Sequence, residues 1–126
     1  MSAAAPRLIV LFFAVLAFTC RAQVPPSPGD KAGYSGLFAA AAAGDSAGIR
    51  ALIARKAKLD ERDAHGRTPL HVAAHGGNRE AMRLLVAAGA DANALERDRY
   101  DIVTIAAVAN DLPTLKVALE LGASAK

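Results

Sequence analysis

The sequence is poor in the residues that give a small domain an aromatic core or a covalent framework. It has no tryptophan, two tyrosines, four phenylalanines and a single cysteine, Cys20. One cysteine cannot form an intramolecular disulfide, so the class of small disulfide-stapled domains is excluded. The Gly-x-Gly-x-x-Gly pattern and the phosphate-binding loop are also missing, so no nucleotide cofactor is predicted. The core must therefore be built mainly from aliphatic side chains.

Long hydrophobic runs are scarce too, apart from a short one near the N-terminus. Residues 8–18 are eleven consecutive uncharged apolar residues that follow Arg7. About 20 would be needed to span a bilayer, whereas this length is typical of a secretory signal. We predict a signal peptide over residues 1–22, cleaved after Ala22, with no stable membrane anchor afterwards. The alternatives are an uncleaved anchor and a lipid on Cys20, although Thr19 stands where a lipoprotein signal usually has a smaller residue.

Export would place the mature chain in the periplasm or outside the cell. A proline-rich linker, residues 23–29, follows the predicted cleavage site and is expected to stay extended without packing. Removal of the leader also removes Arg7 and Arg21 from the 15 basic residues, leaving 13 against 12 acidic ones, or a net charge of +1. A nearly neutral domain gives no electrostatic support for nucleic-acid binding.

The rest of the chain repeats itself with a period of 33 residues. The segment that starts at Asp30 aligns without a gap with the one that starts at Asp63, and a third copy starts at Glu96. The copies span residues 30–62, 63–95 and 96–126. Such self-similarity is typical of stacked units that bury their apolar faces only against their neighbours.

The middle copy carries start and stop signals for two helices. Thr68 is a good N-cap, and Pro69 suits the first helical position because its missing N–H would have no partner there. The glycine pair that begins at Gly76 ends this helix, and Asn78 is expected to cap the next one. Gly89 can supply the left-handed residue that ends the second helix.

Two leucines of this copy, Leu70 and Leu85, are expected to be almost fully buried between the repeats.

The outer copies depart from the pattern. Lys56 replaces the glycine found at Gly89, so the second helix of the first copy is expected to end less sharply. Asp101 takes the capping position in the third copy and is expected to cap its first helix.

The run from Gly66 to Ala74, with its Thr-Pro-Leu-His sequence, closely resembles the ankyrin repeat, as does the later segment from Gly89 to Ala94. The resemblance implies an all-α ankyrin-repeat solenoid over residues 30–126. Its stacked helix-turn-helix units with hairpin loops would form about three repeats. It also implies that His71 bonds across the turn of its unit to the Thr.

The third copy ends without a polar terminal unit of the kind that closes most solenoids. Apolar residues of its second helix are therefore expected to be partly exposed in an isolated monomer. Self-association through this end, or a natural chain that continues further, would cover them. These residues are Leu115, Val117, Ala118 and Leu119.

A catalytic site is not predicted. His71 and His75 are four residues apart on one helix, a spacing that lets two imidazoles share a metal ion. However, Val72 stands where a metalloprotease would have its glutamate, and no third ligand is obvious. A metal-dependent hydrolase using His71 and His75 is kept only as the weakest alternative. No enzyme activity, metal or cofactor is predicted.

The resemblance instead implies binding of another protein through the hairpin tips and the exposed face of each first helix. Tyr34, Arg67 and Tyr100 occupy equivalent positions, and tyrosine and arginine are enriched at binding hot spots. We expect all three to be exposed, so that replacing them together would abolish binding without lowering the melting temperature. The implied contact residues are Lys31, Ala32, Tyr34, Ala42, Ala43, Ala64, His65, Arg67, His75, Gly76, Arg97, Asp98, Tyr100, Val108 and Ala109.

The sequence thus predicts a protein-protein interaction module in an extracytoplasmic compartment. Basic residues near the tips, Arg62, Arg97 and Arg99, favour a partner with an acidic patch. The alternative is an accessory or inhibitory subunit of a periplasmic enzyme.

Overall fold

The computed structural model describes residues 24–123, and the predicted signal peptide lies outside the described residues. Within this range the chain forms helices and connecting loops, with no β-strand assigned. A short helix, α2, precedes three helix pairs, one pair for each copy of the repeat. The helices are α2 (Pro28–Gly33), α3 (Gly36–Ala43), α4 (Ser46–Ala54), α5 (Pro69–His75), α6 (Arg79–Ala87), α7 (Ile102–Val108) and α8 (Leu112–Glu120).

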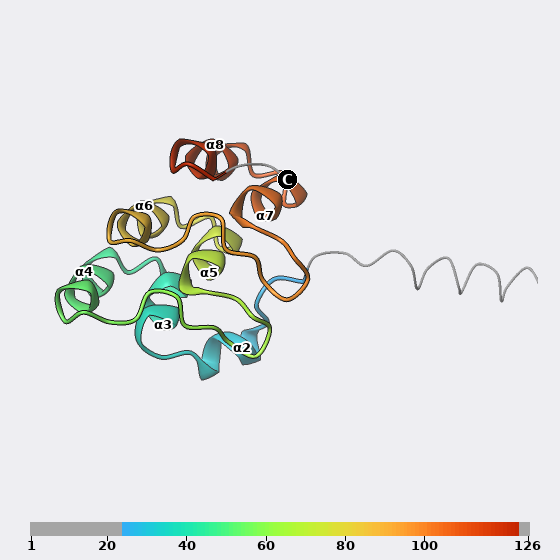
Figure 1. Ribbon diagram of the computed structural model, residues 1–126. Coiled ribbons are helices and arrows are strands. Elements are labelled where there is room, and N and C mark those ends of the chain that lie inside the picture. The colour runs from blue at the N-terminus through green and yellow to red at the C-terminus, as the bar shows by residue number, and fades with distance from the viewer. Residues whose placement is uncertain (1–23, 124–126) are drawn as a thin grey trace, which may run out of the picture.

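The helix pairs stack in register into two layers (Figure 1). Helices α3, α5 and α7 pack against one another in the inner layer, while α4, α6 and α8 pack in the outer layer. The long loops from each outer helix to the next inner helix extend past the inner layer (Figure 1). The predicted all-α solenoid of about three repeats is therefore confirmed.

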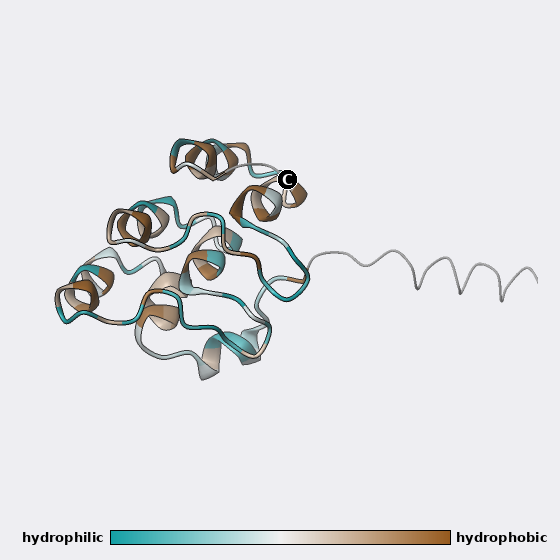
Figure 2. Cartoon of the chain, viewed as in Figure 1, coloured by the Kyte–Doolittle hydropathy of each residue, from teal (hydrophilic) through white to brown (hydrophobic). Residues whose placement is uncertain are grey.

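The core is built mainly from aliphatic side chains between the layers and between the repeats. Leu70 is 2% exposed and Leu85 is fully buried, as predicted. Figure 2 shows hydrophobic residues concentrated on the helices, with hydrophilic residues in the long loops and on α2. Alanines such as Ala73, which is fully buried, let neighbouring helices approach closely.

Two of the three predicted helix caps are confirmed. The Thr68 side chain accepts a hydrogen bond from the His71 N–H, and the Asp101 side chain accepts one from the Thr104 N–H. Asn78 precedes α6 but makes no capping bond. Its side-chain amide instead donates to the Ala41 carbonyl at 2.7 Å, at the C-terminal end of α3. Asn78 therefore links the middle repeat to the first one.

Helix α4 of the first repeat ends at a defined residue even though Lys56 replaces the glycine found in the middle repeat. Lys56 takes a positive φ of 58°, and α4 ends at Ala54, so that it has nine residues, like α6. Arg99 likewise takes a φ of 66° where the middle copy has Gly66 at 72°. The prediction of a less sharply ended helix was wrong, because Lys56 takes the left-handed conformation itself, and the N–H groups of Lys56 and Ala57 bond back to the Ile53 and Leu52 carbonyls of α4.

The N-terminal part of the described chain also differs from its prediction. Ser27 and Asp30 form a capping box that starts α2 at Pro28, so the predicted boundary between linker and repeat falls inside a helix. The first copy therefore has α2 where the other copies have a hairpin. Residues of the linker pack on the repeats, and Pro26 is buried. The expectation that residues 24–27 would not pack was wrong.

The last repeat is partly open, as expected, but not at every predicted residue. Leu119 is 51% exposed and Leu112 is 68% exposed. Val117 and Ala118, however, are 5% and 0% exposed, because they face the packed side of α8 rather than its outer side. The exposed apolar surface is thus limited to part of this end.

Candidate partner-binding surface

The long loops that follow α4 and α6 form equivalent hairpins. In the first hairpin the Asp63 N–H donates to the Arg67 carbonyl at 2.9 Å. In the second, the Glu96 N–H donates to the Tyr100 carbonyl at 3.0 Å. The two hairpins are joined by a bond of 3.2 Å from the Arg97 N–H to the His65 carbonyl. The two tips therefore lie side by side along one edge of the stack.

Arg62 braces this edge from the side. Its guanidinium donates to the Gly66 carbonyl at 2.7 Å and to the Leu95 carbonyl at 2.6 Å, which lie in successive hairpins. One guanidinium nitrogen of Arg62, Nη1, is thus used within the fold, while the residue as a whole is exposed.

Most of the predicted contact residues at the tips are exposed. Val108, at the end of α7, is 55% exposed, and the side chain of His65 is 46% exposed. The exposed members of the predicted set are Lys31, Ala32, Ala43, Ala64, His65, Gly76, Arg97, Asp98, Val108 and Ala109.

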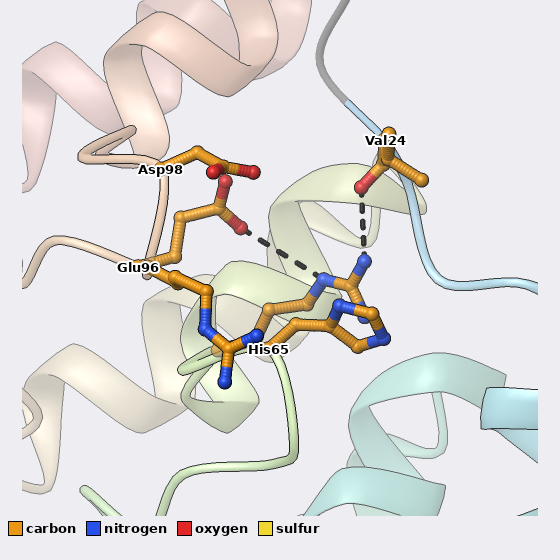
Figure 3. Close-up of a pocket in the computed structure, with 6 residues that line it drawn as sticks. Val24, His65, Glu96 and Asp98 are labelled. Atoms are coloured by element: carbon orange, nitrogen blue, oxygen red, sulfur yellow. Dashed lines mark hydrogen bonds and ion pairs between the residues drawn. The ribbon is translucent and has the colours of Figure 1, made fainter.

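Arg67 does not lie on the surface. It is 1% exposed, and its guanidinium is 3.3 Å from Asp63, 3.5 Å from Asp30 and 3.8 Å from Glu96. It also donates to the Val24 carbonyl at 2.9 Å (Figure 3). The prediction of an exposed Arg67 was wrong, because carboxylates at the same position of all three copies surround it and stabilise its charge.

Tyr34 and Tyr100 are also less available than predicted. Both are half-buried and pack against the core. The Tyr34 hydroxyl donates to Asp63 at 2.6 Å, and its ring stacks on Phe38 with 5.2 Å between the ring centres. The predicted hot-spot set is therefore mostly structural, and replacing it would change stability as well as binding.

The electrostatics of this cluster follow from burial and pairing. Burial, followed by the hydrogen bond to Asp63, raises the pKa of Tyr34 to about 12. Burial alone would raise the pKa of Asp63, but bonds from Tyr34 and from backbone N–H groups outweigh it and lower that pKa. Burial raises the pKa of Glu96, with Arg67 acting against the rise. Asp63 is therefore the firmer anionic partner of Arg67.

The two histidines considered as metal ligands differ in the contacts of their ring nitrogens. His71 accepts from the Thr68 N–H on Nδ1 at 2.9 Å, so Nε2 carries the proton and donates to the Ala94 carbonyl at 2.8 Å. The implied contact with the Thr is present, with Oγ1 also 2.9 Å from Nδ1. Both ring nitrogens of His71 are thus used in the fold.

His75 is half-buried as a residue, but its side chain is only 6% exposed, and Nε2 lies 3.9 Å from Glu96. Burial, with help from Arg67 and His71, lowers the pKa of His75 to about 4. It is therefore neutral near pH 7, and its contact with Glu96 is not an ion pair there. Within residues 24–123, no group of three His, Cys, Asp or Glu side chains is arranged to hold a metal ion. The metal hypothesis thus lacks a third ligand in this range.

Two small cavities lie near the hairpins. One of about 110 Å³ is lined by Val24, His65, Arg67, Glu96, Arg97 and Asp98 (Figure 3). Another of about 40 Å³ is lined by Pro25, Pro26, Lys31, Ala42, Val72, His75 and Gly76. Val24 lines the first cavity, and Pro25 and Pro26 line the second. Sequence reasoning did not place this segment there. The Ser-Pro-Gly-Asp sequence of the capping box was the available signal that this segment starts a helix.

The fold and this surface define a class of helical repeat proteins that present a row of loops along a stack. The chain belongs to the ankyrin repeat family, because the model for ankyrin repeats in three copies matches residues 11–96 and 37–126. It is also 29% identical over 69 residues to the ankyrin repeat protein FPV244 of Fowlpox virus (strain NVSL). That match covers 55% of this chain and 10% of the viral protein. Ankyrin repeats are generally modules for binding other proteins.

Proposed function

We propose that this chain binds a partner protein through the two hairpin tips and the adjoining end of α7. The observation that carries the proposal is the row of exposed side chains that the linked hairpins present along one edge. His65, Arg97 and Asp98 lie at this edge with their residues exposed. They belong to rigidly braced loops, so a partner would meet a preorganised surface, which lowers the entropic cost of binding.

The charge of the edge suits a polar partner surface with an acidic part. Arg97 and Arg99 are exposed, while the buried Arg67 is neutralised within the fold. Rim charges of this kind raise the association rate more than the affinity. Binding should therefore weaken at high ionic strength, mainly through slower association.

The proposal is tested by a variant that combines His65→Ala, Arg97→Ala and Asp98→Ala. The matched control combines Arg50→Ala and Arg83→Ala on the outer layer, where both side chains are exposed. Affinity capture from the native host, quantified by mass spectrometry, should lose its enriched partner with the tip variant and keep it with the control. Equal recovery with both variants would reject the proposed surface.

We place this activity in the periplasm or outside the cell, on the strength of the apolar run at residues 8–18 and the small residue Ala22. Within residues 24–123, no helix is long and apolar enough to cross a membrane. Mass spectrometry of the protein from its native host should find a chain that starts near Gln23. A chain that retains Met1 would contradict removal of the leader. A lipid on Cys20 would contradict cleavage after Ala22.

Self-association through the last repeat is a second proposal, supported by the exposure of Leu112 and Leu119. Leu119→Glu would place a charge on this surface without disturbing the buried face of α8. Analytical ultracentrifugation should show a dimer or larger species for the wild-type chain and a monomer for the variant. A wild-type chain that stays monomeric at high concentration would remove this proposal.

The same module could act as an accessory or inhibitory subunit of an enzyme in that compartment. In the capture experiment, this alternative predicts that the protein lost with the hairpin-tip variant is an enzyme. The tested surface is the same in both cases.

A further inference from the structure

Residues 24–27, which we call the strap, cover part of the inner layer. Pro26 is buried, and Pro25 and Pro26 line the cavity of about 40 Å³ on α3 and α5. Four residues of this cavity, Lys31, Ala42, His75 and Gly76, belong to the surface that the ankyrin resemblance implies for partner contact. The chain's own N-terminal segment therefore occupies a part of the predicted partner face.

The strap has the conformation and chemistry of a peptide ligand. Its proline pair fixes φ near −65°, and Ser27 continues in extended form with φ −72° and ψ 164°. Such a polyproline-like segment has little conformational entropy to lose on binding and leaves its carbonyls free to accept hydrogen bonds. One of them, that of Val24, accepts from Arg67 at 2.9 Å.

The strap prolines and the residues beneath them line one small cavity together. Ala42 and Gly76 are small and Val72 is apolar, and the His75 ring lines the cavity beside them. Arg67 stands beside this groove with its side chain 2% exposed, and its Nε atom has no hydrogen-bond partner. If the strap left, Arg67 would also lose the bond to Val24, and a partner carbonyl would have to replace it.

We propose that the groove on α3 and α5 is a binding site for an extended segment with two adjacent prolines, and that the strap is its built-in occupant. A partner segment with a carbonyl just before its proline pair would displace the strap and take over the bond from Arg67. This inference rests on the proposed protein-binding function in one respect, because the segment that displaces the strap is taken to belong to a partner protein. The groove itself can be tested without any partner.

The probe is the capped peptide acetyl-Val-Pro-Pro-Ser-Pro-amide, which has the sequence of residues 24–28. It is titrated into the full chain carrying Pro25→Ser and Pro26→Ser, which weaken the strap. The control is Pro28→Ser, at the first position of α2 and outside the groove. Circular dichroism checks that all chains are folded, and Pro26→Ala against Pro28→Ala replaces the pair if the double variant unfolds.

The peptide should bind the strap variant and shift the NMR signals of Val72, His75 and Gly76. It should bind the wild-type chain and the Pro28→Ser control at least about tenfold more weakly, because a tethered strap competes at an effective concentration on the order of millimolar. A peptide with alanines in place of the proline pair should bind weakly to every chain.

Equal peptide binding by the wild-type chain and the strap variant would overturn the proposal, as would no binding to the strap variant at several millimolar. Shifts confined to other helices, or equal binding of the alanine peptide, would also overturn it. The outcome is independent of the hairpin tips, so a failed capture experiment would leave this result standing, and the reverse also holds.

Discussion

At the scale of the residue, the burial of Arg67 determines which parts of the hairpins remain for a partner. The side chains of Asp63 and Glu96 are only 9% and 4% exposed, and Arg67 is the cation nearest to both. Removing one member of a buried charged set leaves the others uncompensated, which is far more destabilising than losing an exposed ion pair. Arg67 therefore belongs to the folding core and not to the binding surface.

Replacing Arg67 by methionine should lower the free energy of unfolding by roughly 3 to 5 kcal/mol, the range for breaking a buried ion pair. The matched change Arg97→Met, at an exposed residue of the next hairpin, should stay within about 0.5 kcal/mol. Urea unfolding followed by circular dichroism measures both. Similar midpoints for the two variants would show that the cluster around Arg67 does not stabilise the fold.

The buried His75 predicts a dependence of stability on pH. Its pKa is about 4 in the folded chain, below the ordinary value of 6.5. The unfolded chain therefore takes up a proton first as the pH falls, and stability that is fully present above pH 6.5 is lost progressively down to about pH 4. At about 1.4 kcal/mol per pH unit, His75 contributes a loss of up to about 3 kcal/mol.

His75→Gln should remove this contribution, so that its free energy of unfolding falls less than that of the wild-type chain between pH 7 and 4.5. His71, whose pKa burial also lowers, contributes in the same direction in both chains. The raised pKa of Glu96 has the opposite effect, because this group increases the free energy of unfolding as the pH falls. His65→Gln, at an exposed residue, is the control. An unchanged slope for His75→Gln would argue against a buried neutral imidazole.

At the scale of the element, core packing should outweigh capping. Leu85 is fully buried on α6, so Leu85→Ala should cost roughly 2 to 5 kcal/mol through lost contacts and a cavity. Thr68→Ala removes the cap of α5 and should cost about 1 kcal/mol. Thermal melts compare the two variants directly. If both lowered the melting temperature equally, the assignment of core and cap would be wrong.

The elements that sequence reasoning placed well are those with strong local signals. The Thr68 cap, the proline at the start of α5 and the apolar spacing around Leu85 are all local, and they fix where helices start and which faces are buried. The bond from Asn78 to Ala41 and the bond from the Arg97 N–H to the His65 carbonyl depend on a neighbouring repeat. Such effects cannot be read from one repeat alone, because tertiary packing overrides local preference.

At the scale of the whole molecule, the candidate site was harder to predict than the fold. The period of 33 residues did place Asp30, Asp63 and Glu96 at equivalent positions, and stacking brings all three around Arg67. The sequence pattern alone does not show that this arginine points into the stack rather than away from it. Nor does it show that residues 24–27 fold back over the inner layer, since that contact with Arg67 joins positions 43 residues apart.

The central claim is that partners bind at the row of hairpin tips, and site-specific photo-crosslinking in the native host tests it most directly. A photoreactive amino acid is placed at Ala64, on an exposed tip, and in a second chain at Arg83, on the outer layer. Light should produce a discrete crosslinked species containing another protein from position 64 and none from position 83. Crosslinks from position 83 alone, or equally from both positions, would contradict the account.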